Sequence, residues 1–398
     1  MKRTRYLEID FGGGFLVLLA LLGVLVAAGA VSAWTMEHQG HYVTGMTNQV
    51  VWGLPHVFAV FLIVAASGAL NVASLGSVFG QVPYKPLARL SGLLAIALLA
   101  GGLAILVLDL GRPDRLIVAM THYNFRSIFA WNIFLYTGFF VIVAAYLWTQ
   151  MDRSVAGYTR GMGGLAFAWR LILTTGTGSI FGFLIAREAY DAAIMAPLFI
   201  VLSLAFGTAI FLLVALGLFR ATGRRFDPEV RDRLGRLLGW FVAATLLLVA
   251  IHHLTNLYAA EHLAAERLIL RDGGAITTLF WLGQVLLGGL LPAWLLLRPG
   301  TRGSAPMLVF ACLLVIVGGL ATMYVIIIGG QTVPLDLFPG KEVSSSFFDG
   351  VPARYAPSLP EFGLGLGGSA LALILVLIGV RVLPLLPDAM PGATAARD

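Results

Sequence analysis

Ten runs of about twenty apolar residues constrain this chain of 398 residues more than any other feature. A run of that length crosses the hydrocarbon core of a bilayer as an α-helix. Since 59% of the residues are hydrophobic and only 12% are charged, the chain lacks the polar residues that a water-exposed surface needs. We therefore predict an all-α polytopic membrane protein with ten transmembrane helices in a lipid bilayer. The predicted spans are 11–33, 54–79, 91–109, 125–148, 167–187, 197–219, 236–258, 276–297, 306–329 and 364–383.

The distribution of Lys and Arg predicts the orientation of these spans. The first run follows Lys2, Arg3 and Arg5, but it is too long for a secretory signal and is expected to remain as a helix. The loops on one side carry fifteen Lys and Arg residues and those on the other side six, so both termini are predicted to be cytoplasmic. The net charge is +6, but the basic residues lie in these short loops, which is the pattern of topology signals. This pattern argues against nucleic-acid binding.

Several kinds of chemistry are excluded by what the sequence lacks. The single cysteine, Cys312, rules out a disulfide framework and iron–sulfur ligation by this chain alone. There is no P-loop or other nucleotide fingerprint, and no pair of histidines with metal-ligand spacing shares a helix face, so no metal site is predicted. A haem b held between His56 and either His252 or His253 stays open as an alternative.

Polar residues collect at the ends of the spans that face outward. Asn48, Trp52 and His56 repeat every four residues and are predicted to share one helix face. Asp109 and Arg112 end the third span, either as an ion pair that closes the helix or as functional groups. The other candidates in this outer layer are Tyr123, Asn124, Arg187, Glu188, Asp191, His252 and His253. Arg187 and Asp191 are four residues apart and form either an ion pair or functional groups. His252 and His253 point about 100° apart on a helix, so both are not expected to face one ligand, and His41 in the first outer loop is expected to be solvated. Acids and histidines that converge near the interface are suited to proton-coupled chemistry.

Two outward loops, 34–53 and 330–362, are long and do not have the composition of flexible linkers. Loops of that length are commonly functional or held by a partner. We interpret them as a docking surface for an extracytoplasmic subunit rather than an idle cap.

Three motifs resemble the NrfD/PsrC family, the membrane subunits of polysulfide-reductase-like complexes. They are Trp52-Gly53-Leu54-Pro55, the turn Asp109-Leu110-Gly111-Arg112-Pro113, and Asn124-Phe125-Arg126-Ser127. The segment before the last span, from Tyr355 to Glu361, resembles the ten-helix branch that includes the HybB and DsrP subunits. Within that branch, the run 45–80 looks most like DsrP of the Dsr sulfur-metabolism membrane complex.

This resemblance implies a function and a domain plan. It implies two four-helix bundles, here 34–191 and 192–329, flanked by an N-terminal segment 1–33 and a C-terminal segment 330–398. It also implies a subunit of the bacterial cytoplasmic (inner) membrane that exchanges electrons with menaquinone or ubiquinone. The implied partners are an extracytoplasmic ferredoxin-like iron–sulfur subunit and other membrane and cytochrome subunits, without which this subunit does not catalyse turnover.

On that basis each outer residue receives an expected role. His56 or Asp109 exchanges the protons of the quinone, while Asn48, Trp52, Tyr123 and Asn124 hold the head group. Arg112, Glu188, Asp191, His252 and His253 form a proton pathway. Two other classes stay open: a proton-coupled secondary transporter, which would place polar groups in broken helices near the midplane, and a b-type cytochrome anchor.

Overall fold

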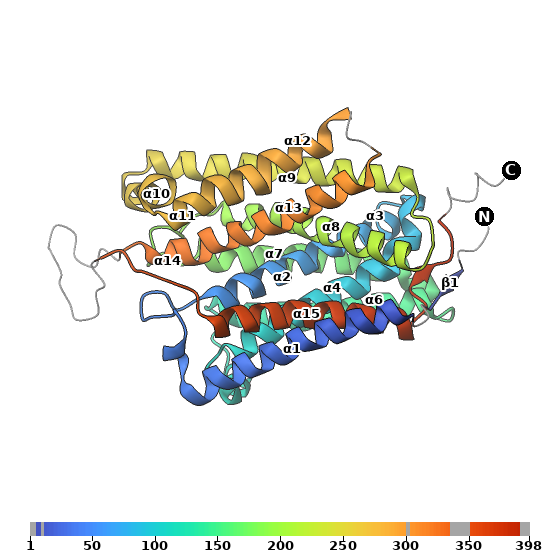
Figure 1. Ribbon diagram of the computed structural model, residues 1–398, viewed down its shortest axis with the longest axis horizontal. Coiled ribbons are helices and arrows are strands. Elements are labelled where there is room, and N and C mark those ends of the chain that lie inside the picture. The colour runs from blue at the N-terminus through green and yellow to red at the C-terminus, as the bar shows by residue number, and fades with distance from the viewer. Residues whose placement is uncertain (1–4, 9–11, 300–302, 335–350, 391–398) are drawn as a thin grey trace.

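The computed structural model describes residues 5–8, 12–299, 303–334 and 351–390. Long helices run side by side through the molecule (Figure 1). The first half of the chain forms β1 (Tyr6–Leu7), α1 (Gly13–Gln39), η1 (His41–Val43), α2 (Leu54–Ala69), α3 (Asn71–Ser77), η2 (Val82–Leu87), α4 (Ala88–Leu108), η3 (Pro113–Arg115), α5 (Leu116–Thr121), α6 (Ile128–Met151), η4 (Ala156–Tyr158) and α7 (Thr159–Gly182).

The second half adds a further set of helices. They are α8 (Met195–Ala221), α9 (Pro228–Tyr258), η5 (Ala260–His262), α10 (Leu263–Arg267), η6 (Leu268–Asp272), α11 (Ala275–Thr278), η7 (Leu279–Leu290), α12 (Leu291–Leu297), α13 (Ala305–Tyr324), η9 (Val325–Gly329), α14 (Gly330–Thr332) and α15 (Leu359–Val382), followed by β2 (Leu386–Pro387). The segments η6, η7 and η9 are π-helical, a wider winding that often marks functional regions.

The prediction of an all-α polytopic membrane protein is confirmed. Among the described residues, nine helices are long and apolar enough to cross a membrane. The one remaining predicted span, the fifth at 167–187, falls on α7, which is 24 residues long but carries Arg160 and Arg170 and is richer in Thr and Gly. That α7 also crosses the bilayer stays a prediction.

Helix α2 is the centre of the molecule. Together with α3 it forms a span whose most apolar window is 94% buried, whereas the corresponding value for α1 is 11%. Protein therefore surrounds α2 on all sides, while α1 packs against α15 at the edge and exposes apolar side chains such as Leu21 and Val24 (Figure 1). In a bilayer those side chains would face lipid.

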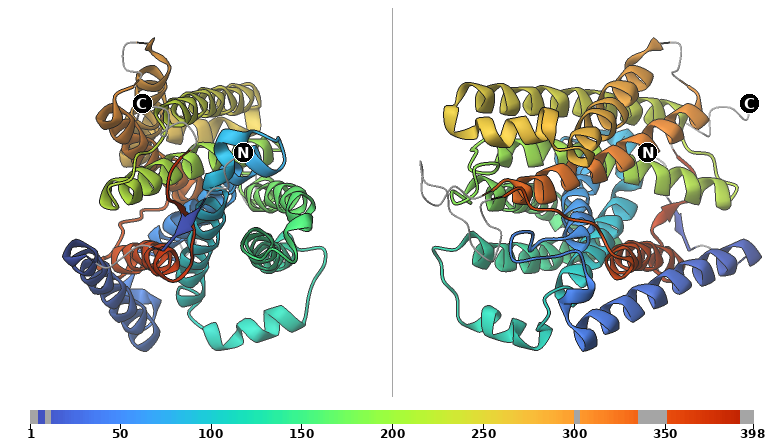
Figure 2. Two further views of the ribbon diagram at one scale, coloured as in Figure 1. Left: turned by 90° about the vertical axis from the view of Figure 1, so that its right-hand side faces the viewer. Right: turned by 60° about the vertical axis from the view of Figure 1, so that its left-hand side comes forward.

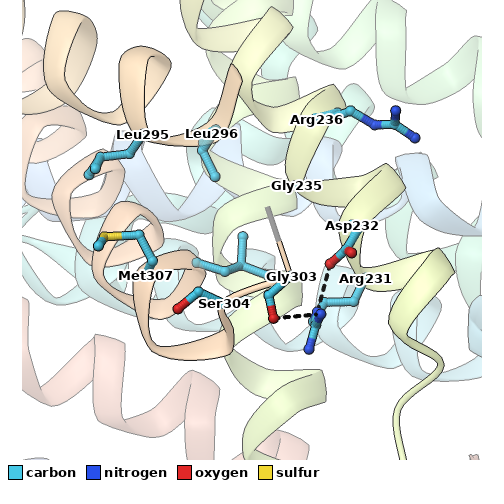
Figure 3. Close-up of a pocket in the computed structure, with 10 residues that line it drawn as sticks. Arg231, Asp232, Gly235, Arg236, Leu295, Leu296, Gly303, Ser304 and Met307 are labelled. Atoms are coloured by element: carbon cyan, nitrogen blue, oxygen red, sulfur yellow. Dashed lines mark hydrogen bonds and ion pairs between the residues drawn. The ribbon is translucent and has the colours of Figure 1, made fainter. Parts of the chain in front are cut away.

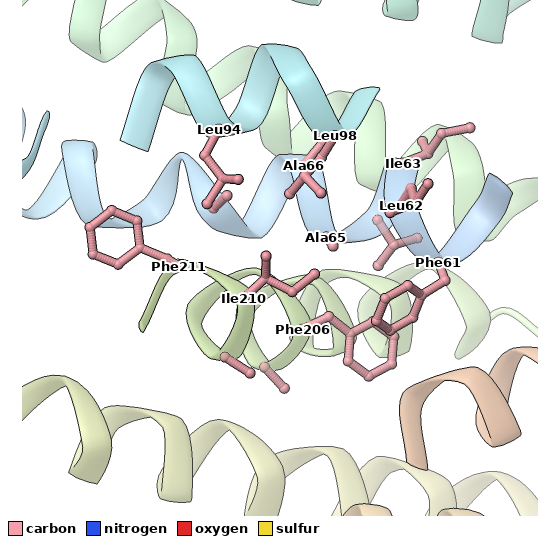
Figure 4. Packing of buried hydrophobic residues seen from close by; sticks show 14 of the residues in the cluster. Phe61, Leu62, Ile63, Ala65, Ala66, Leu94, Leu98, Phe206, Ile210 and Phe211 are labelled. Carbon is pink, nitrogen blue, oxygen red and sulfur yellow. The ribbon is translucent and has the colours of Figure 1, made fainter. Parts of the chain in front are cut away.

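Helix contacts sort most of the long helices into two groups. Helices α2, α4, α6 and α7 pack together, and α8, α9, α12 with η7, and α13 form a second group. However, α2 contacts α8 as extensively as it contacts α4. Figure 4 shows Leu94 and Leu98 of α4 on one side of α2, and Phe206 and Ile210 of α8 on the other. The domain boundary between 191 and 192 therefore stays a prediction.

Glycines bring the backbones of α2 and α8 together. A Cβ placed on Gly68 would lie 1.5 Å from the backbone oxygen of Ser203. A Cβ on Gly207 would lie 2.1 Å from the backbone nitrogen of Ala69. Small residues at helix crossings allow the backbone contact that drives helix association in membranes. The glycine crossing, Gly68 with Gly207, thus fixes how the two groups of helices meet.

The helices end in two chemically different layers. One layer, the Asp109 end, contains the start of α2 and the ends of α4, α7 and α9. The opposite layer, the arginine end, contains Lys85, Arg89 and the arginines between Arg220 and Arg236. At the arginine end, β1 pairs with β2 through Tyr6 and Pro387, which ties the two terminal segments together.

Substituting Ala at Gly68 or Gly207 is expected to destabilise the protein by about 1–3 kcal/mol or more, because a backbone contact cannot relax around an added methyl group. The readout is the thermal unfolding temperature in detergent. Gly217→Ala is the matched control, because a Cβ at Gly217 on the same helix α8 meets nothing within 4 Å. Equal unfolding temperatures for all three variants would contradict the crossing.

Candidate functional site

A buried carboxylate with two histidines lies at the end of α4. The side chain of Asp109 is fully buried, and its Oδ2 lies 2.9 Å from Nδ1 of His56 in the first turn of α2. Its Oδ1 lies 3.8 Å from Nε2 of His41 in η1, and the same His41 nitrogen lies 3.2 Å from the backbone oxygen of Asp109. Three segments far apart in the sequence therefore meet at one acid.

The electrostatics of this triad favour a charged Asp109. Burial opposes the charged carboxylate, but the side chains of His41 and His56 outweigh burial and lower the pKa of Asp109. The same contact with Asp109 raises the pKa of His41. Neither carboxylate oxygen receives a well-aligned hydrogen bond from the described residues, so the carboxylate keeps unused acceptor capacity inside the protein.

Aromatic rings form a wall beside the triad. The indole of Trp52 stacks against the imidazole of His56 at a centroid separation of 6.1 Å. Phe129 at the start of α6 and Phe181 at the end of α7 lie 6.1 and 6.0 Å from the same indole. Tyr190 follows at 6.5 Å. Such a wall suits a flat, apolar ring placed next to an acid–base pair.

Hydrogen bonds from the second group of helices hold this wall in place. Gln331 of α14 accepts the backbone N–H groups of Val51 and Trp52 at Oε1, and donates from Nε2 to the Trp52 carbonyl. Arg187 donates to the backbone oxygens of Gln331 and Gln49. The position of Trp52 is therefore set by groups on both sides of the molecule.

A second buried acid organises the segment above the site. Glu361 in the first turn of α15 is fully buried. It accepts hydrogen bonds from the backbone N–H of Gly45, the backbone N–H of Ser358 and the hydroxyl of Tyr355. The Tyr355 hydroxyl in turn accepts the N–H of Leu54, at the start of α2. Burial and the bond to Glu361 raise the pKa of Tyr355, so it stays a hydrogen-bond donor.

A third buried acid, Glu266, lies at the same end in the second group of helices. It contacts Nδ1 of His253 at 2.7 Å and accepts a hydrogen bond from Asn256 at 3.0 Å. His252, Gln284 and His253 line a small cavity of about 20 Å³, room for about one water molecule. Nδ1 of His252 and Oε1 of Gln284 have no hydrogen-bond partner among the described residues, so a water there would satisfy both.

The adjacent histidines behave differently from the sequence prediction. Their 100° separation along the helix was expected to prevent both from facing one ligand. Instead, ligand atoms of His252, His253 and Glu266 all lie within 4.8 Å of one another, close enough to hold a metal ion. Only His253 contacts Glu266 directly, whereas Asn256 lies between His252 and Glu266, 3.5 Å from Nε2 of His252 and 3.0 Å from Oε1 of Glu266.

Three predicted pairings are wrong. Helix α2 begins at Leu54, where Pro55 occupies its first turn, so Asn48 and Trp52 precede the helix and share no face with His56. Arg112 pairs with exposed Asp114 rather than with Asp109. The third pairing, between Arg187 and Asp191, fails because α7 ends at Gly182 and both lie in the following segment.

The remaining predicted residues lie around the site rather than in it. Asn48 is exposed, and Tyr123 and Asn124 lie on the loop between α5 and α6. Figure 2 shows α5 standing away from the helix bundle. The Asn124 side chain accepts the N–H of Arg126 in a turn, and the Glu188 backbone oxygen contacts His262. Asp191 is exposed and has a positive φ of 35°.

The centre of the predicted 330–362 loop, residues 335–350, lies outside the described residues.

The sequence interpretation missed three groups of this end. His41 was expected to be solvated in the loop, yet it contacts Asp109. Glu266 was not singled out, although it is fully buried. The role of Gln331 was equally hidden, because only the fold brings it to Trp52. A buried Arg170 in α7, bonded to Asn71, was also missed.

The fold and the buried acid–histidine groups define a polytopic membrane protein whose buried acids and histidines lie at one end of the helices. A family model described as Polysulphide reductase, NrfD matches residues 42–334. The chain belongs to the NrfD family, as the three motifs predicted.

Related proteins share most of the length of this sequence. The Hdr-like menaquinol oxidoreductase integral membrane subunit of Archaeoglobus fulgidus is 29% identical over 94% of this protein and 94% of its own length. The menaquinone reductase integral membrane subunit of Nitratidesulfovibrio vulgaris is 22% identical over 94% of this protein and 92% of its own length. Protein NrfD of Escherichia coli is 25% identical over 71% of this protein and 96% of its own length.

The contact between His41 and Asp109 predicts a pH-dependent stability. The lowered pKa of Asp109 means that its contribution is present above about pH 4 and is lost as pH falls further. The raised pKa of His41 means that its contribution is complete below about pH 6.5 and is lost as pH rises through the folded-state value. The stability gap between wild type and His41→Gln should therefore be widest between these limits and narrow outside them.

Thermal unfolding measured across this pH range tests the expectation. His38→Gln is the control, because His38 is exposed and its ring bonds to Trp34 within its own helix. A gap for His41→Gln that stays constant from pH 4 to pH 9 would show that the contact is not ionic.

Proposed function

We propose that this protein is the quinone-reactive membrane subunit of a redox complex, and that the head group reacts beside His56 and Asp109. The observation that carries the proposal is the buried Asp109–His56 contact next to the Trp52 wall. Membership of the NrfD family supports it, as do relatives named for menaquinol and menaquinone. Menaquinone or ubiquinone is the expected substrate.

In this proposal each group has a step. Asp109 holds Nδ1 of His56, which leaves Nε2 of that imidazole to accept a proton from a quinol hydroxyl. Removal of two protons and two electrons converts the quinol to the quinone, and reduction reverses each step. Proton transfer through the His56–Asp109 pair keeps charge from building up as electrons leave. The flat ring packs on Trp52 and its aromatic neighbours.

We further propose that electrons pass to an iron–sulfur subunit docked over the Asp109 end, on the extracytoplasmic side. The excess of Lys and Arg at the opposite end supports this orientation under the positive-inside rule, and it makes both termini cytoplasmic. The bonds of Glu361 support a rigid docking surface, because they fix the segment around Gly45 to the start of α15. Tyr42, which is 80% exposed, lies on that surface.

Protons need a route to and from the triad. His41 supports an exit toward the outer loops, because its side chain is 31% exposed while Asp109 is enclosed. The proposed pathway through Glu188, Asp191, His252 and His253 is supported only in its last part, where Glu266 joins the two histidines. Arg112 is exposed and belongs to the surface of the same loop.

Asp109→Asn is expected to lower quinol turnover by about a hundredfold or more, the usual contribution of a positioned acid–base group. The assay follows oxidation of a menaquinol analogue by the assembled complex. Asp114→Asn is the matched control, since Asp114 is an exposed acid of the same turn paired only with Arg112. Near-normal turnover of well-assembled Asp109→Asn enzyme would show that Asp109 has only a structural role in an ion pair.

An iron–sulfur subunit is expected to co-purify with tagged protein from solubilised membranes, and Tyr42→Arg should weaken that association. Iron content and the electron paramagnetic resonance spectrum of the purified material provide the readout. Tyr258→Arg is the control, because Tyr258 is 94% exposed at the same end but on α9 of the second group. A homogeneous single subunit with substrate-driven proton flux would instead identify a transporter.

A further inference from the structure

A groove runs between α8 and α13 at the arginine end, far from the triad. It has a volume of about 780 Å³, within the range of binding sites for small molecules. Apolar side chains form most of it, including Leu213, Leu216, Val309 and Leu313. Its chemistry therefore differs from a water-filled vestibule, which would be lined by polar groups.

Three arginines line this groove. They are Arg220 at the end of α8, Arg224 in the following turn and Arg231 in the first turns of α9. No acidic residue lines the groove among the described parts of the chain. Asp232, outside the groove, pairs with Arg231, whereas Arg220 and Arg224 have no carboxylate partner among the described residues. The groove therefore keeps an excess of positive charge, which favours binding of an anion.

The three side chains are held in different ways, and each keeps donors available. Arg231 donates to Asp232 and to the Gly303 carbonyl, as Figure 3 shows. Arg224 makes only long contacts of 3.3 and 3.4 Å with the Pro387 and Leu386 carbonyls. Arg220 is exposed, and its guanidinium makes no hydrogen bond to another described residue. Since a guanidinium has five N–H donors, the cluster can still bind a phosphate through several of them.

An apolar track continues from the groove along α13. Phe310, Leu313 and Val317 are 49%, 48% and 55% exposed and are spaced at three and four residues, so they share one face. A ligand with its anionic group on the arginines would place long apolar chains along this face. Charge at one end and a long apolar track at the other match the shape of a membrane lipid.

We propose that this groove binds an anionic phospholipid from the leaflet at the arginine end. The phosphate lies on Arg220, Arg224 and Arg231, and an acyl chain packs against Leu216 and Leu313. A quinone does not fit this pattern, because its neutral head group gives three arginines no charge to bind. A zwitterionic lipid carries a cation next to its phosphate, so the arginine cluster discriminates against it.

Thermal unfolding of the delipidated full chain in detergent tests the proposal. Phosphatidylglycerol is titrated against phosphatidylcholine with the same acyl chains, and inorganic phosphate is a third arm. We expect a saturable rise in unfolding temperature with phosphatidylglycerol at a lipid concentration about tenfold lower than with phosphatidylcholine. Equal responses to both lipids, or a full response to phosphate alone, would overturn the lipid assignment.

Two variants separate the head-group contact from the acyl-chain contact. The double variant Arg220→Gln/Arg224→Gln should need about tenfold more phosphatidylglycerol for the same shift. Arg225→Gln is the matched control, an exposed arginine of the same turn that does not line the groove. Unchanged titration of the double variant would refute the role of the arginines.

The second variant is Gly217→Trp, which fills the groove. Gly217 lines it, and a Cβ at this position meets nothing within 4 Å, so the protein should fold with an unchanged unfolding temperature before lipid is added. We expect the phosphatidylglycerol response to fall by about tenfold or more, as the acyl chain loses its place. A response equal to wild type would place the lipid elsewhere on the protein.

Discussion

The arrangement of the other helices depends on the contact between the backbones of α2 and α8. Gly68 and Gly207 allow the two helices to touch without intervening side chains. Because lipid tails are as apolar as leucine, helices in a bilayer gain little from burying apolar surface and associate through close packing instead. Helix α2 is thereby enclosed by neighbours and provides a rigid support for its first turn. That turn carries His56, so the position of the candidate acid–base pair depends on a crossing several helical turns away.

Each of the three fully enclosed acids is stabilised by polar partners, and the partners differ from one acid to the next. Asp109 contacts two imidazoles, Glu361 accepts backbone and tyrosine donors, and Glu266 combines a histidine with an amide. A carboxylate removed from water requires such partners. Only Asp109 is left with oxygens that lack well-aligned hydrogen bonds to the described residues, and of the three acids only Asp109 adjoins the aromatic wall. These two properties distinguish Asp109 from the two other acids and support the proposal that it is the reactive one.

The sequence predicted the helices well because a span of apolar residues has one stable form in a bilayer. It predicted Asp109 and His56 because ionisable groups at span ends are costly. It could not predict their partners. Pairings within one segment, such as Asp109 with Arg112, were favoured because spacing is visible in a sequence. The actual partners, His41 for Asp109 and Gln331 for Trp52, come from distant segments that only tertiary packing brings together. The other wrong predictions, a helix face shared by Asn48, Trp52 and His56 and the pair of Arg187 with Asp191, came from helix boundaries. Helix α2 begins next to Pro55 and α7 ends at Gly182, and the apolar pattern does not reveal these boundaries.

The amide of Gln331 has a mechanical consequence. Its oxygen accepts the N–H groups of Val51 and Trp52, and its nitrogen donates to the Trp52 carbonyl. Its own helix α14 continues the span of α13, which belongs to the second group. Its Nε2 also bonds the Ile327 carbonyl, which Tyr190 shares, within the π-helical turn η9. A sliding motion between the two groups would therefore either break these bonds or drag the indole away from His56. The second group of helices thus takes part in positioning the indole beside His56.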